Sequence, residues 1–233
     1  MTDTIFLAGG SGVVGMNLIP RLRKDDWRVV ASTQSKAKFQ LLEKVGAEPV
    51  TMDAFDAQSV IDAVTAARPS VILHQLTSLP DGLDPEQMPA ARERNAKIRD
   101  VGTRNLVAAA IACGTTRFVS QSIAFAYAKG DPPHSEEDPL DPTQWGVISL
   151  EKQTLGGPFT GVVLRYGFFY GPGTGFELPT RPGSIHIEDA AEAACVAARH
   201  GAAGIYNIAE DDGMFDVRKA ATQLHFSARQ HGS

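Results

Sequence analysis

The sequence predicts an α/β protein built on a doubly wound parallel sheet, and three observations carry that prediction. Short apolar runs alternate with helical stretches through the first two thirds of the chain. The runs, such as IFLA and VVLR, are apolar almost throughout, as expected for parallel strands that helices cover on both faces. Three glycines spaced three apart, Gly9, Gly12 and Gly15, follow the first run. Alternating strands and helices are typical of βαβ units.

The expected elements follow this alternation along the chain. Strands are predicted at 5–8, 28–32, 49–52, 71–75, 117–121 and 161–166, and helices at 13–24, 36–45, 57–67, 86–112 and 147–154. The segment 167–184 is rich in Gly and Pro, which predicts a loop. After it we expect a helix at 188–200, a short strand at 205–208 and a last helix that begins near Phe215.

Composition excludes several classes of function. The chain has 233 residues, 43% of them hydrophobic, and a formal net charge of −5. A surface that tracks phosphates would need clustered positive charge, so no nucleic-acid partner is expected. The two cysteines, Cys113 and Cys195, lie in Ala-rich helical stretches without ligand spacing around them, so neither a metal site nor a disulfide is expected. No apolar run approaches the ~18 residues of a membrane span and no leader pattern opens the chain, which predicts a cytoplasmic protein with no membrane partner.

The three glycines predict a dinucleotide site, because they stand between a strand and a helix. Gly9 allows a tight turn, Gly12 lets the backbone approach a pyrophosphate, and Gly15 allows the helix to pack closely on the strand. The following helix offers unpaired N–H groups and the positive end of its dipole to the phosphates. A glycine-rich turn without a ligand is the alternative. The sequence thus predicts a Rossmann-like NAD(P)-binding domain over residues 1–170, with a small, reduced C-terminal substrate lobe over 171–233 packed on it.

The residues after the second strand bear on the choice between NAD and NADP. An acidic residue about 20 positions beyond the glycine loop would bind the ribose 2′-hydroxyl of NAD. No Asp or Glu occurs between Arg28 and Leu42. The side chains of Thr33, Gln34 and Lys36 suit a 2′-phosphate better than a bare diol, so NADP is favoured over NAD. No Arg is present there to grip the phosphate with two parallel hydrogen bonds.

Six segments, in order, carry a resemblance to a known family. They read AGGSGVVG, VTMDAFD, VILHQLT, RFVSQSIAFAY, VVLRYGFFYGPG and SIHIEDAAEA. Together they resemble the NAD(P)-dependent epimerase/dehydratase family of extended short-chain dehydrogenases/reductases, over nearly the whole chain. The resemblance implies an oxidoreductase with a nicotinamide cofactor and a small-molecule substrate. It also implies a homodimer formed through the long helix at 86–112, because family members commonly pair there.

The resemblance further implies where the cofactor lies. Backbone contacts beside the three glycines are implied at Ser11, Val13 and Val14. Positions at the ends of later strands would border the adenine, pass the ribose and phosphates, and lie near the nicotinamide. In that order these are Asp53 and Ala54; Leu76 and Thr77; Ser120, Gln121 and Ser122; and Tyr166, Gly167 and Phe168. The carboxyl ends of successive parallel strands are where a ligand lies in such a sheet.

The sequence departs from the family where its chemistry is usually carried. The usual pair is a Tyr and, four residues on, a Lys on the same helix face, where the Lys lowers the pKa of the Tyr. Glu151 fits the acidic residue that commonly follows this pair, but the Tyr and Lys positions fall on Thr143 and Val147. Lys152 has Ile148, not Tyr, four residues before it. The usual pair is absent.

Other hydroxyl groups are candidates for proton transfer. Ser122 lies one residue from the family's Ser/Thr position, which falls on Ile123. Tyr127 follows the fifth strand and Tyr166 ends the sixth. Tyr127 is more simply explained as a loop aromatic that packs on the rim of the sheet, and Tyr166 is explained equally well by packing or by chemistry.

Two further polar residues allow two interpretations each. Arg99 points off the apolar stripe of its helix, so it either reaches an anion at the site or is solvated. His74 ends the fourth strand and is more simply explained as a core histidine satisfied by one hydrogen bond than as a catalytic base.

The length of the last loop limits the substrate. The connection between GPGTG and SIHIEDAA spans only 176–183, close to ordinary loop length, whereas relatives that act on nucleotide sugars have longer segments there. We therefore predict an NADP- or NAD-dependent oxidoreductase that acts on a small carbonyl or alcohol. The alternative is a catalytically inactive NAD(P)-binding sensor or scaffold.

Overall fold

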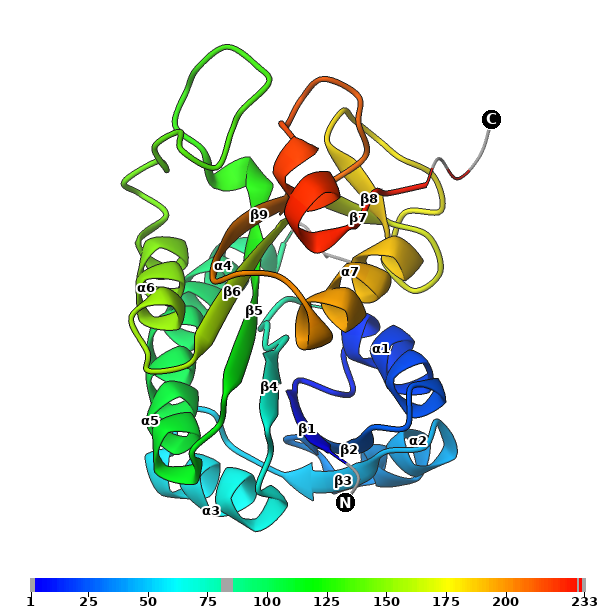
Figure 1. Cartoon of the computed structure of the whole chain (residues 1–233), viewed down its shortest axis with the longest axis vertical. Helices are drawn as coiled ribbons and strands as arrows, with labels where there is room; N and C mark the ends of the chain where they lie inside the picture. Colours follow the sequence, from blue (N-terminus) through cyan, green and yellow to red (C-terminus); the bar gives the residue numbers. More distant parts are fainter. Residues whose placement is uncertain (1–2, 81–85, 230, 232–233) are drawn as a thin grey trace.

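Seven parallel strands form the central sheet in a computed structural model of the chain (Figure 1). The structure describes residues 3–80, 86–229 and 231. The strand order is β3-β2-β1-β4-β5-β6-β9, so the chain winds outward from β1 in one direction and from β4 in the other. All neighbouring strands pair in parallel. The predicted doubly wound sheet is confirmed.

Observed strand bounds lie within two residues of the predicted ones. The strands are β1 Thr4–Ala8, β2 Arg28–Thr33, β3 Glu48–Thr51, β4 Val71–His74, β5 Arg117–Ile123, β6 Thr160–Tyr166 and β9 Gly204–Ile208. The helices outside the long central one are α1 Val13–Lys24, α2 Phe39–Lys44 (after the short 3₁₀ turn η1 Lys36–Lys38), α3 Ala57–Ala67, α6 Trp145–Leu155 and α7 Ile187–Arg199.

Helices cover both faces of the sheet and produce two core layers. Ile5 and Leu7 of β1 pack in the layer under α1 and α7, and Phe6 and Ala8 pack in the layer under α3 and α5. All four are fully buried, which explains why this strand is apolar at every position. Removal of this apolar surface from water is the main stabilising contribution to the fold.

The predicted long helix at 86–112 contains a local widening. It consists of α4 Met88–Lys97, a π-helical turn η3 Ile98–Gly102, and α5 Thr103–Cys113. The Thr103 hydroxyl donates to the carbonyl oxygen of Arg99 at 2.5 Å, which satisfies a backbone group of the turn. Such turns inside α-helices are frequent at functional sites.

The C-terminal third differs from the prediction in two places. The predicted loop at 167–184 contains the short strand β7 Phe168–Tyr170 and ends in a second one, β8 Ser184–His186. The two strands pair in parallel, and all three residues of β7 are aromatic. The last helical turn, η5 Ala220–Leu224, begins later than predicted. Asp216 explains the delay, because its side chain accepts a hydrogen bond from the Arg218 backbone N–H and holds the preceding chain out of helix.

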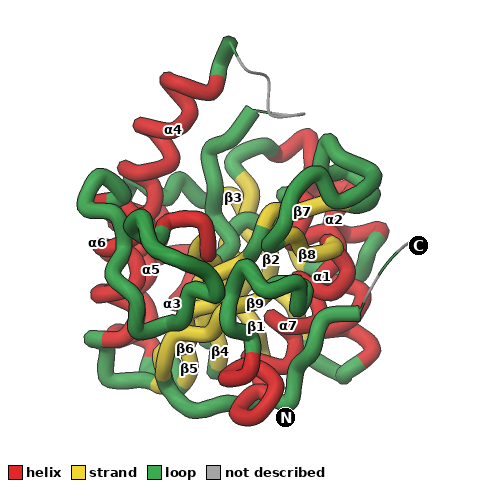
Figure 2. Tube along the Cα trace, turned by 90° about the horizontal axis from the view of Figure 1, so that it is seen from above, coloured by secondary structure: helices red, strands yellow, loops and turns green. Residues whose placement is uncertain are grey.

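Several elements surround the carboxyl ends of the strands. Seen from above, α4 lies to one side of this edge and β7 and β8 lie to the other, with loops between them (Figure 2). The part of the chain after residue 170 also supplies β9 to the sheet and α7 to the layer beside α1. Among the described residues, no helix is long and apolar enough to cross a membrane.

Candidate active site

The glycine loop joins β1 to α1 at the carboxyl edge of the sheet. Gly9 has a φ of +90°, in the left-handed region, and a Cβ there would lie 2.7 Å from the carbonyl oxygen of Gln75. A Cβ on Gly15 would lie 2.5 Å from the carbonyl oxygen of Gly10. Both positions therefore require glycine, and α1 begins directly against the loop.

Gly12 differs from its neighbours because it faces open space. A Cβ there would meet only the carbonyl oxygen of Gly9, at 3.4 Å. Gly12 is also the N-cap of α1, where no side chain caps the helix and the first turn holds no acidic residue. The backbone N–H groups at Val13 and Val14, beside Ser11, thus lack the helical partners of later residues. An uncapped helix N-terminus above open space fits a pyrophosphate.

A buried amide lies beside the same loop. Gln75 directly follows β4 and is 4% exposed. Within the described residues, neither its side-chain nitrogen nor its oxygen makes a well-formed hydrogen bond. The Tyr166 hydroxyl lies close enough to interact with this amide. The residues at this edge fit a dinucleotide.

The loop after β2 presents hydroxyl, amide and ammonium groups. The Ser11 and Thr33 hydroxyl oxygens are 3.1 Å apart, and Thr33 Oγ1 also accepts from the Ser35 backbone N–H at 3.3 Å. Gln34 and Lys36 are exposed immediately beyond. The structure thus brings the predicted ribose-side residues next to the glycine loop.

The predicted positions after β3 and β4 also lie at this edge. Asp53 forms a turn in which its carboxylate accepts from the Phe55 backbone N–H at 3.0 Å, and Ala54 beside it is buried. Leu76 is half-buried and Thr77 is exposed.

The predicted nicotinamide-side positions are more deeply placed. Ser120 and Gln121 are buried within β5, and the Ser120 hydroxyl shares a 2.8 Å hydrogen bond with that of Thr154 on α6. Gly167 is buried against the backbone of Gly183, and Phe168 begins β7. Ser120 therefore supports the site from below.

A buried ion pair lies at the ends of β5 and β6. Glu151 on α6 accepts from Arg165 at 2.9 Å on one carboxylate oxygen and 2.7 Å on the other, and both side chains are almost completely buried. The Ser122 hydroxyl donates to the same carboxylate at 2.7 Å. Burial by itself would lower the pKa of Arg165, but hydrogen bonds and charge from Glu151 raise it above its ordinary value. Arg165 is therefore charged.

Tyr127 joins this cluster through Arg165. Its hydroxyl accepts from the guanidinium at 2.9 Å and donates to the side-chain oxygen of Asn207 on β9 at 2.6 Å. Burial raises the pKa of Tyr127, and the charge of Arg165 offsets only part of that rise. The phenol is thus a neutral donor near neutral pH. The structure brings Ser122 and Tyr127 together around one guanidinium–carboxylate pair.

Tyr166 does not join them. Its neighbour in register is Ile123, whereas Ser122 pairs with Arg165, so Tyr166 projects from the opposite face of the sheet. It is fully buried, and its hydroxyl donates to the Ala190 carbonyl oxygen of α7 at 3.1 Å. Burial raises its pKa far above the ordinary value.

The positions of the absent Tyr and Lys pair are apolar or turned away. Val147 is 1% exposed where α6 lies against α4. The Thr143 hydroxyl donates to the Asp141 carboxylate at 2.7 Å in an exposed turn before α6. Neither side chain can relay a proton.

Arg99 is buried, so its interpretation as a solvated residue is wrong. It is 8% exposed and close enough to Glu151 and His74 to interact with both electrostatically. The physical reason is the π-helical turn, whose extra residue rotates Arg99 inward relative to a regular helix.

His74 is a satisfied core histidine. Its Nδ1 accepts from the Leu76 backbone N–H at 3.3 Å, and its Nε2 lies 2.9 Å from the Thr103 hydroxyl. Because that hydroxyl donates onward to Arg99, Nε2 carries the proton. Burial, helped by the charge of Arg99, lowers the pKa of His74 to about 3, which keeps the ring neutral.

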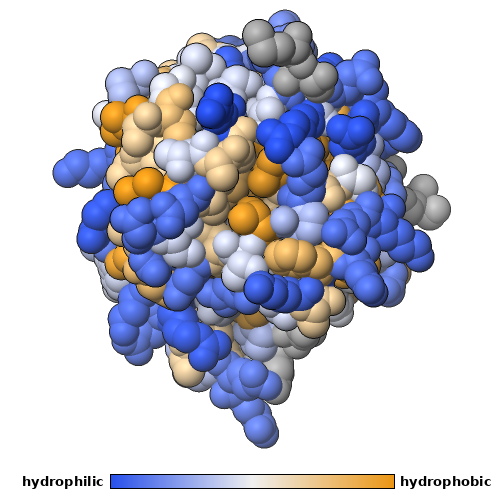
Figure 3. Space-filling model, turned by 90° about the horizontal axis from the view of Figure 1, so that it is seen from below, coloured by the Kyte–Doolittle hydropathy of each residue, from blue (hydrophilic) through white to orange (hydrophobic). Residues whose placement is uncertain are grey.

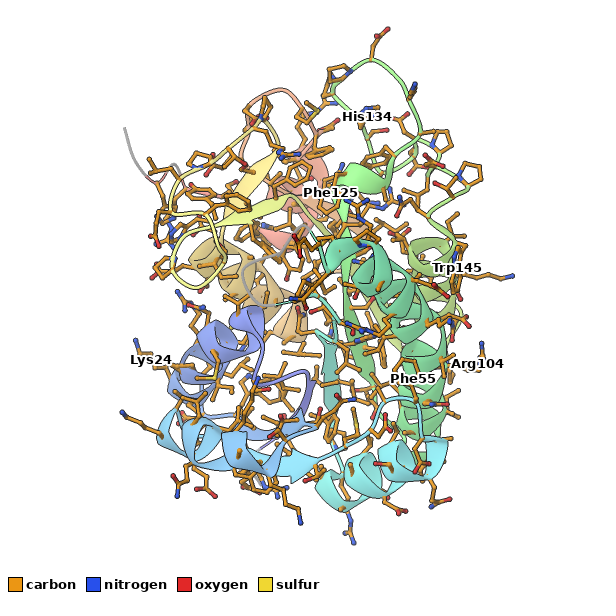
Figure 4. The ribbon with its side chains drawn as sticks, turned by 180° about the vertical axis from the view of Figure 1, so that it is seen from behind. Lys24, Phe55, Arg104, Phe125, His134 and Trp145 are labelled. Atoms are coloured by element: carbon orange, nitrogen blue, oxygen red, sulfur yellow. The ribbon has the colours of Figure 1, made fainter. Side chains whose placement is uncertain are left out.

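An aromatic surface borders the cluster. Phe125, just after β5, stacks on Phe168 with ring centroids 4.3 Å apart, and the Arg181 guanidinium lies 4.6 Å from the centroid of Phe168. Phe125 remains 45% exposed. Seen from behind, Phe125 lies between β7–β8 and α4, well apart from Trp145 at the outer edge (Figure 4).

A shallow hollow of about 650 Å³ lies at the opposite end of the strands. Ile111, Arg117, Phe159 and Ala202 are among its lining residues. Figure 3 views the molecule from this end, where hydrophilic atoms predominate and apolar side chains are scattered among them. The hollow is remote from the glycine loop and is not part of the candidate site.

Strand order, glycine loop and a polar cluster over β5 and β6 define a nucleotide-binding α/β protein of the Rossmann type. A family model of the NAD dependent epimerase/dehydratase family matches residues 5–181. The chain belongs to this family, and the resemblance predicted from its motifs is confirmed.

Individual relatives refine the comparison. The chain is similar to a 3-diazoavenalumate denitrifying reductase from a Streptomyces species. The match has 36% identity over an aligned length of 237 and covers 89% of this chain and 76% of the relative. It is similar in structure to UDP-glucose 4-epimerase from Thermotoga maritima, with a TM-score of 0.79, 16% identity and coverage of 98% and 94%. The enzyme WbmG of Bordetella bronchiseptica, solved with NAD, has a TM-score of 0.75, 17% identity and coverage of 100% and 91%. These structural likenesses show the fold.

Sequence reasoning missed two members of the cluster, Arg165 and Asn207. The signal for Arg165 was a charged residue inside the apolar strand VVLRY, since a charge is buried only when it is paired. Asn207 lies in the similar run GIYNI. Polar residues inside buried strands were the available clue.

Proposed function

We propose that the chain is an NAD(P)H-dependent reductase that transfers a hydride to a small acceptor held above β5 and β6. The carrying observation is the uncapped α1 N-terminus facing open space at Gly12, on the same edge as the cluster of Ser122, Tyr127 and Arg165. When bound, the cofactor supplies the hydride. The protein's residues bind, orient and polarise the acceptor.

The missing proton relay favours an acceptor that needs no proton from the protein. An aryl diazonium group is one such acceptor, since hydride forms a C–H bond at the ring carbon while the C–N bond breaks and N₂ leaves with that electron pair. The similar Streptomyces protein is named as a denitrifying reductase of a diazo acid. An aromatic diazo compound is therefore the first substrate to test, and a small carbonyl or alcohol is the second.

Ser122 and Tyr127 are the proposed hydrogen-bonding groups of the site. Tyr127 stays protonated because burial raises its pKa, so it does not act as a base. Ser122 is fully buried and donates to Glu151, so its proposed role is to hold that carboxylate in place beside the ligand. Tyr166, on the other face, would support the turn under the nicotinamide.

NADP is the proposed cofactor, and NAD is the alternative. Support comes from the exposed Lys36 and Gln34 beside Thr33 and from the lack of a carboxylate between Arg28 and Leu42. Lys36→Glu is expected to weaken NADPH binding about tenfold or more while leaving NADH binding little changed. Calorimetry with both cofactors measures it, with Lys38→Glu as the exposed neighbouring control. Equal effects on both cofactors would refute the assignment.

The short connection at 176–183 supports a small substrate. Neighbouring structures with sugar nucleotides share the fold at 16–19% identity, which does not transfer their substrates. A UDP-sugar is therefore included in the assay as a substrate expected to fail.

The activity assay combines purified protein and each reduced cofactor with aryl diazonium salts, small aldehydes and ketones, and a UDP-sugar. Loss of reduced-nicotinamide absorbance is expected with the diazonium compounds. Deuterium from labelled cofactor should appear on the ring carbon that loses nitrogen. If cofactor binds but no acceptor class is reduced, the reductase proposal fails.

A binding-only sensor is the second candidate function. The observation in its favour is that Tyr127 and Ser122 both donate within the protein, to Asn207 and Glu151. A sensor would distinguish oxidised from reduced cofactor in affinity without turnover. Calorimetry with both redox forms, run beside the activity assay, separates the two functions.

We also propose a homodimer that works in the cytoplasm, where Cys113 and Cys195 would stay reduced. Helices α5 and α6 pack against each other (Figure 1), and Ile111 of α5 and Ile148 and Leu155 of α6 are exposed. Ile148→Glu should shift the protein to monomers in analytical ultracentrifugation. Leu41→Glu, at an exposed leucine on α2, is the control.

A further inference from the structure

Arg99 is a buried cation without a partner. The side chain is 8% exposed, and within the described ranges no carboxylate pairs with it and its guanidinium makes no hydrogen bond. Burial lowers the pKa of Arg99 to about 10, so the group is still charged at neutral pH. Buried charges in proteins are normally paired, because an isolated one loses its hydration without compensation.

The neighbours of Arg99 do not neutralise it. Glu151 is the carboxylate whose charge acts on Arg99, but its two oxygens already accept hydrogen bonds from Arg165 and Ser122. His74 is neutral. Glu136, at the rim of the cluster, accepts from the Asn207 backbone N–H at 2.8 Å and forms no ion pair with Arg99.

The backbone at Arg99 is held in place from β4. A directional chain of hydrogen bonds runs from the Leu76 N–H to His74, from His74 to the Thr103 hydroxyl, and from that hydroxyl to the Arg99 carbonyl oxygen. This chain fixes the π-helical turn that carries the guanidinium. A cation positioned this firmly and left unpaired is suited to an anion supplied by a ligand.

The same edge carries an unfilled aromatic surface. Phe125 stacks on Phe168 and still exposes 45% of its area. Figure 4 shows it beside α4, the helix that continues into the turn bearing Arg99. An exposed ring fixed by a second ring offers a stacking surface to a planar ligand.

We infer that the substrate of this site is an aromatic anion whose ring stacks on Phe125 and whose anionic oxygen, a carboxylate or phenolate, pairs with Arg99. The inference rests on the proposed function in one respect, that the hydride acceptor binds at this edge. His74 and Thr103 are positioning residues for Arg99.

The test is a comparison of matched probes by calorimetry, using the full chain saturated with NADP. Benzoate against benzamide isolates the negative charge, 4-nitrophenolate against nitrobenzene does the same for a phenolate, and benzoate against cyclohexanecarboxylate isolates the aromatic ring. We expect benzoate, or the phenolate, to bind about 10- to 100-fold more tightly than its neutral counterpart.

Arg99→Met should abolish this charge preference and raise the melting temperature, because it removes an unpaired buried charge. The control Arg104→Met lies on the same long helix, at an exposed position, and should leave the preference unchanged. Phe125→Ala should abolish the preference for benzoate over cyclohexanecarboxylate, whereas Trp145→Ala should not.

Equal binding of charged and neutral probes by the unmodified protein would overturn the inference, and so would a complete lack of binding. Loss of NADP affinity in Arg99→Met with the charge preference retained would overturn it too, because Arg99 would then serve the cofactor. Binding needs no turnover, so a charge preference without reduction would refute the reductase proposal alone. Reduction of neutral acceptors without a charge preference would refute this inference alone.

Discussion

The buried pair between Glu151 and Arg165 allows a quantitative prediction for Glu151→Gln. The substitution keeps the shape of the side chain and removes its charge. Two hydrogen bonds from Arg165, at 2.9 and 2.7 Å, and one from Ser122, at 2.7 Å, then meet a neutral amide. Arg165 and Arg99 remain buried together with no counter-charge between them.

The magnitude follows from the burial of both partners. Removing one member of a buried ion pair costs about 3–5 kcal/mol, since it leaves the other charge desolvated and unpaired. Total stabilities of folded domains are about 5–15 kcal/mol, so this is at least about a fifth of the free energy of unfolding. At about 2–4 °C per kcal/mol for a chain of this size, the melting temperature should fall by about 6–20 °C.

Urea denaturation measures the change, and an exposed pair supplies the control. Arg28 and Glu48 are joined by the same two-bond geometry, at 2.9 and 2.5 Å, but both side chains are well exposed. Glu48→Gln should cost no more than about 1 kcal/mol. The double variant Glu151→Leu with Arg165→Met should recover much of the loss, because it removes both charges. Similar small losses for Glu151→Gln and Glu48→Gln would refute the reasoning.

Three more predictions concern titration, the loop and the tail. The pKa of His74 is about 3 in the folded chain and about 6.5 in the unfolded chain. The free energy of unfolding should therefore fall by about 1.4 kcal/mol for each pH unit below pH ~6.5. His74→Gln should flatten the curve of unfolding free energy against pH by that slope; an unchanged slope would contradict it. Gly15→Ala should destabilise the fold, whereas Gly12→Ala should weaken NADPH binding with little change in melting temperature, and the reverse pattern would exclude the proposed cradle. Arg229→Ala should lower the free energy of unfolding, measured by urea denaturation, by about 1–3 kcal/mol, because buried Asp189 loses hydrogen bonds at 2.5 and 2.8 Å. An unchanged free energy would contradict this and show that the contact with His231 is enough to satisfy Asp189.

The central sheet could be predicted from sequence because its signals are local. Each buried strand is a continuous apolar run, and α1 and α3 were predicted with their observed bounds. Strands β7 and β8 could not be found in this way. They are three residues each and pair across an intervening Gly- and Pro-rich loop, so only the packed sheet below them determines that they pair.

The site was only half predictable for a similar reason. The glycine loop is a short continuous segment of the sequence, and its geometry depends on backbone conformations and close contacts that only glycine permits. The cluster around Arg165 joins α6, β5, β6 and β9, and no spacing in the sequence relates those segments. For Arg99 the sequence left two interpretations open, since helical periodicity assumes a constant rotation per residue and the π-helical turn breaks it.

The structure explains why a family member can lack the Tyr and Lys pair and still keep an organised site. Helices α4 and α6 approach so closely that a Cβ on Gly146 would lie 2.6 Å from the Cα of Ala96, which leaves Val147 in a dry contact. A lysine there would be buried in that contact. In the proposed site, Arg99 on the neighbouring turn supplies positive charge, and Tyr127 supplies a tyrosine hydroxyl that its surroundings hold neutral. Such a site is poor at moving protons, in keeping with the proposed transfer of hydride to an acceptor that releases its own leaving group.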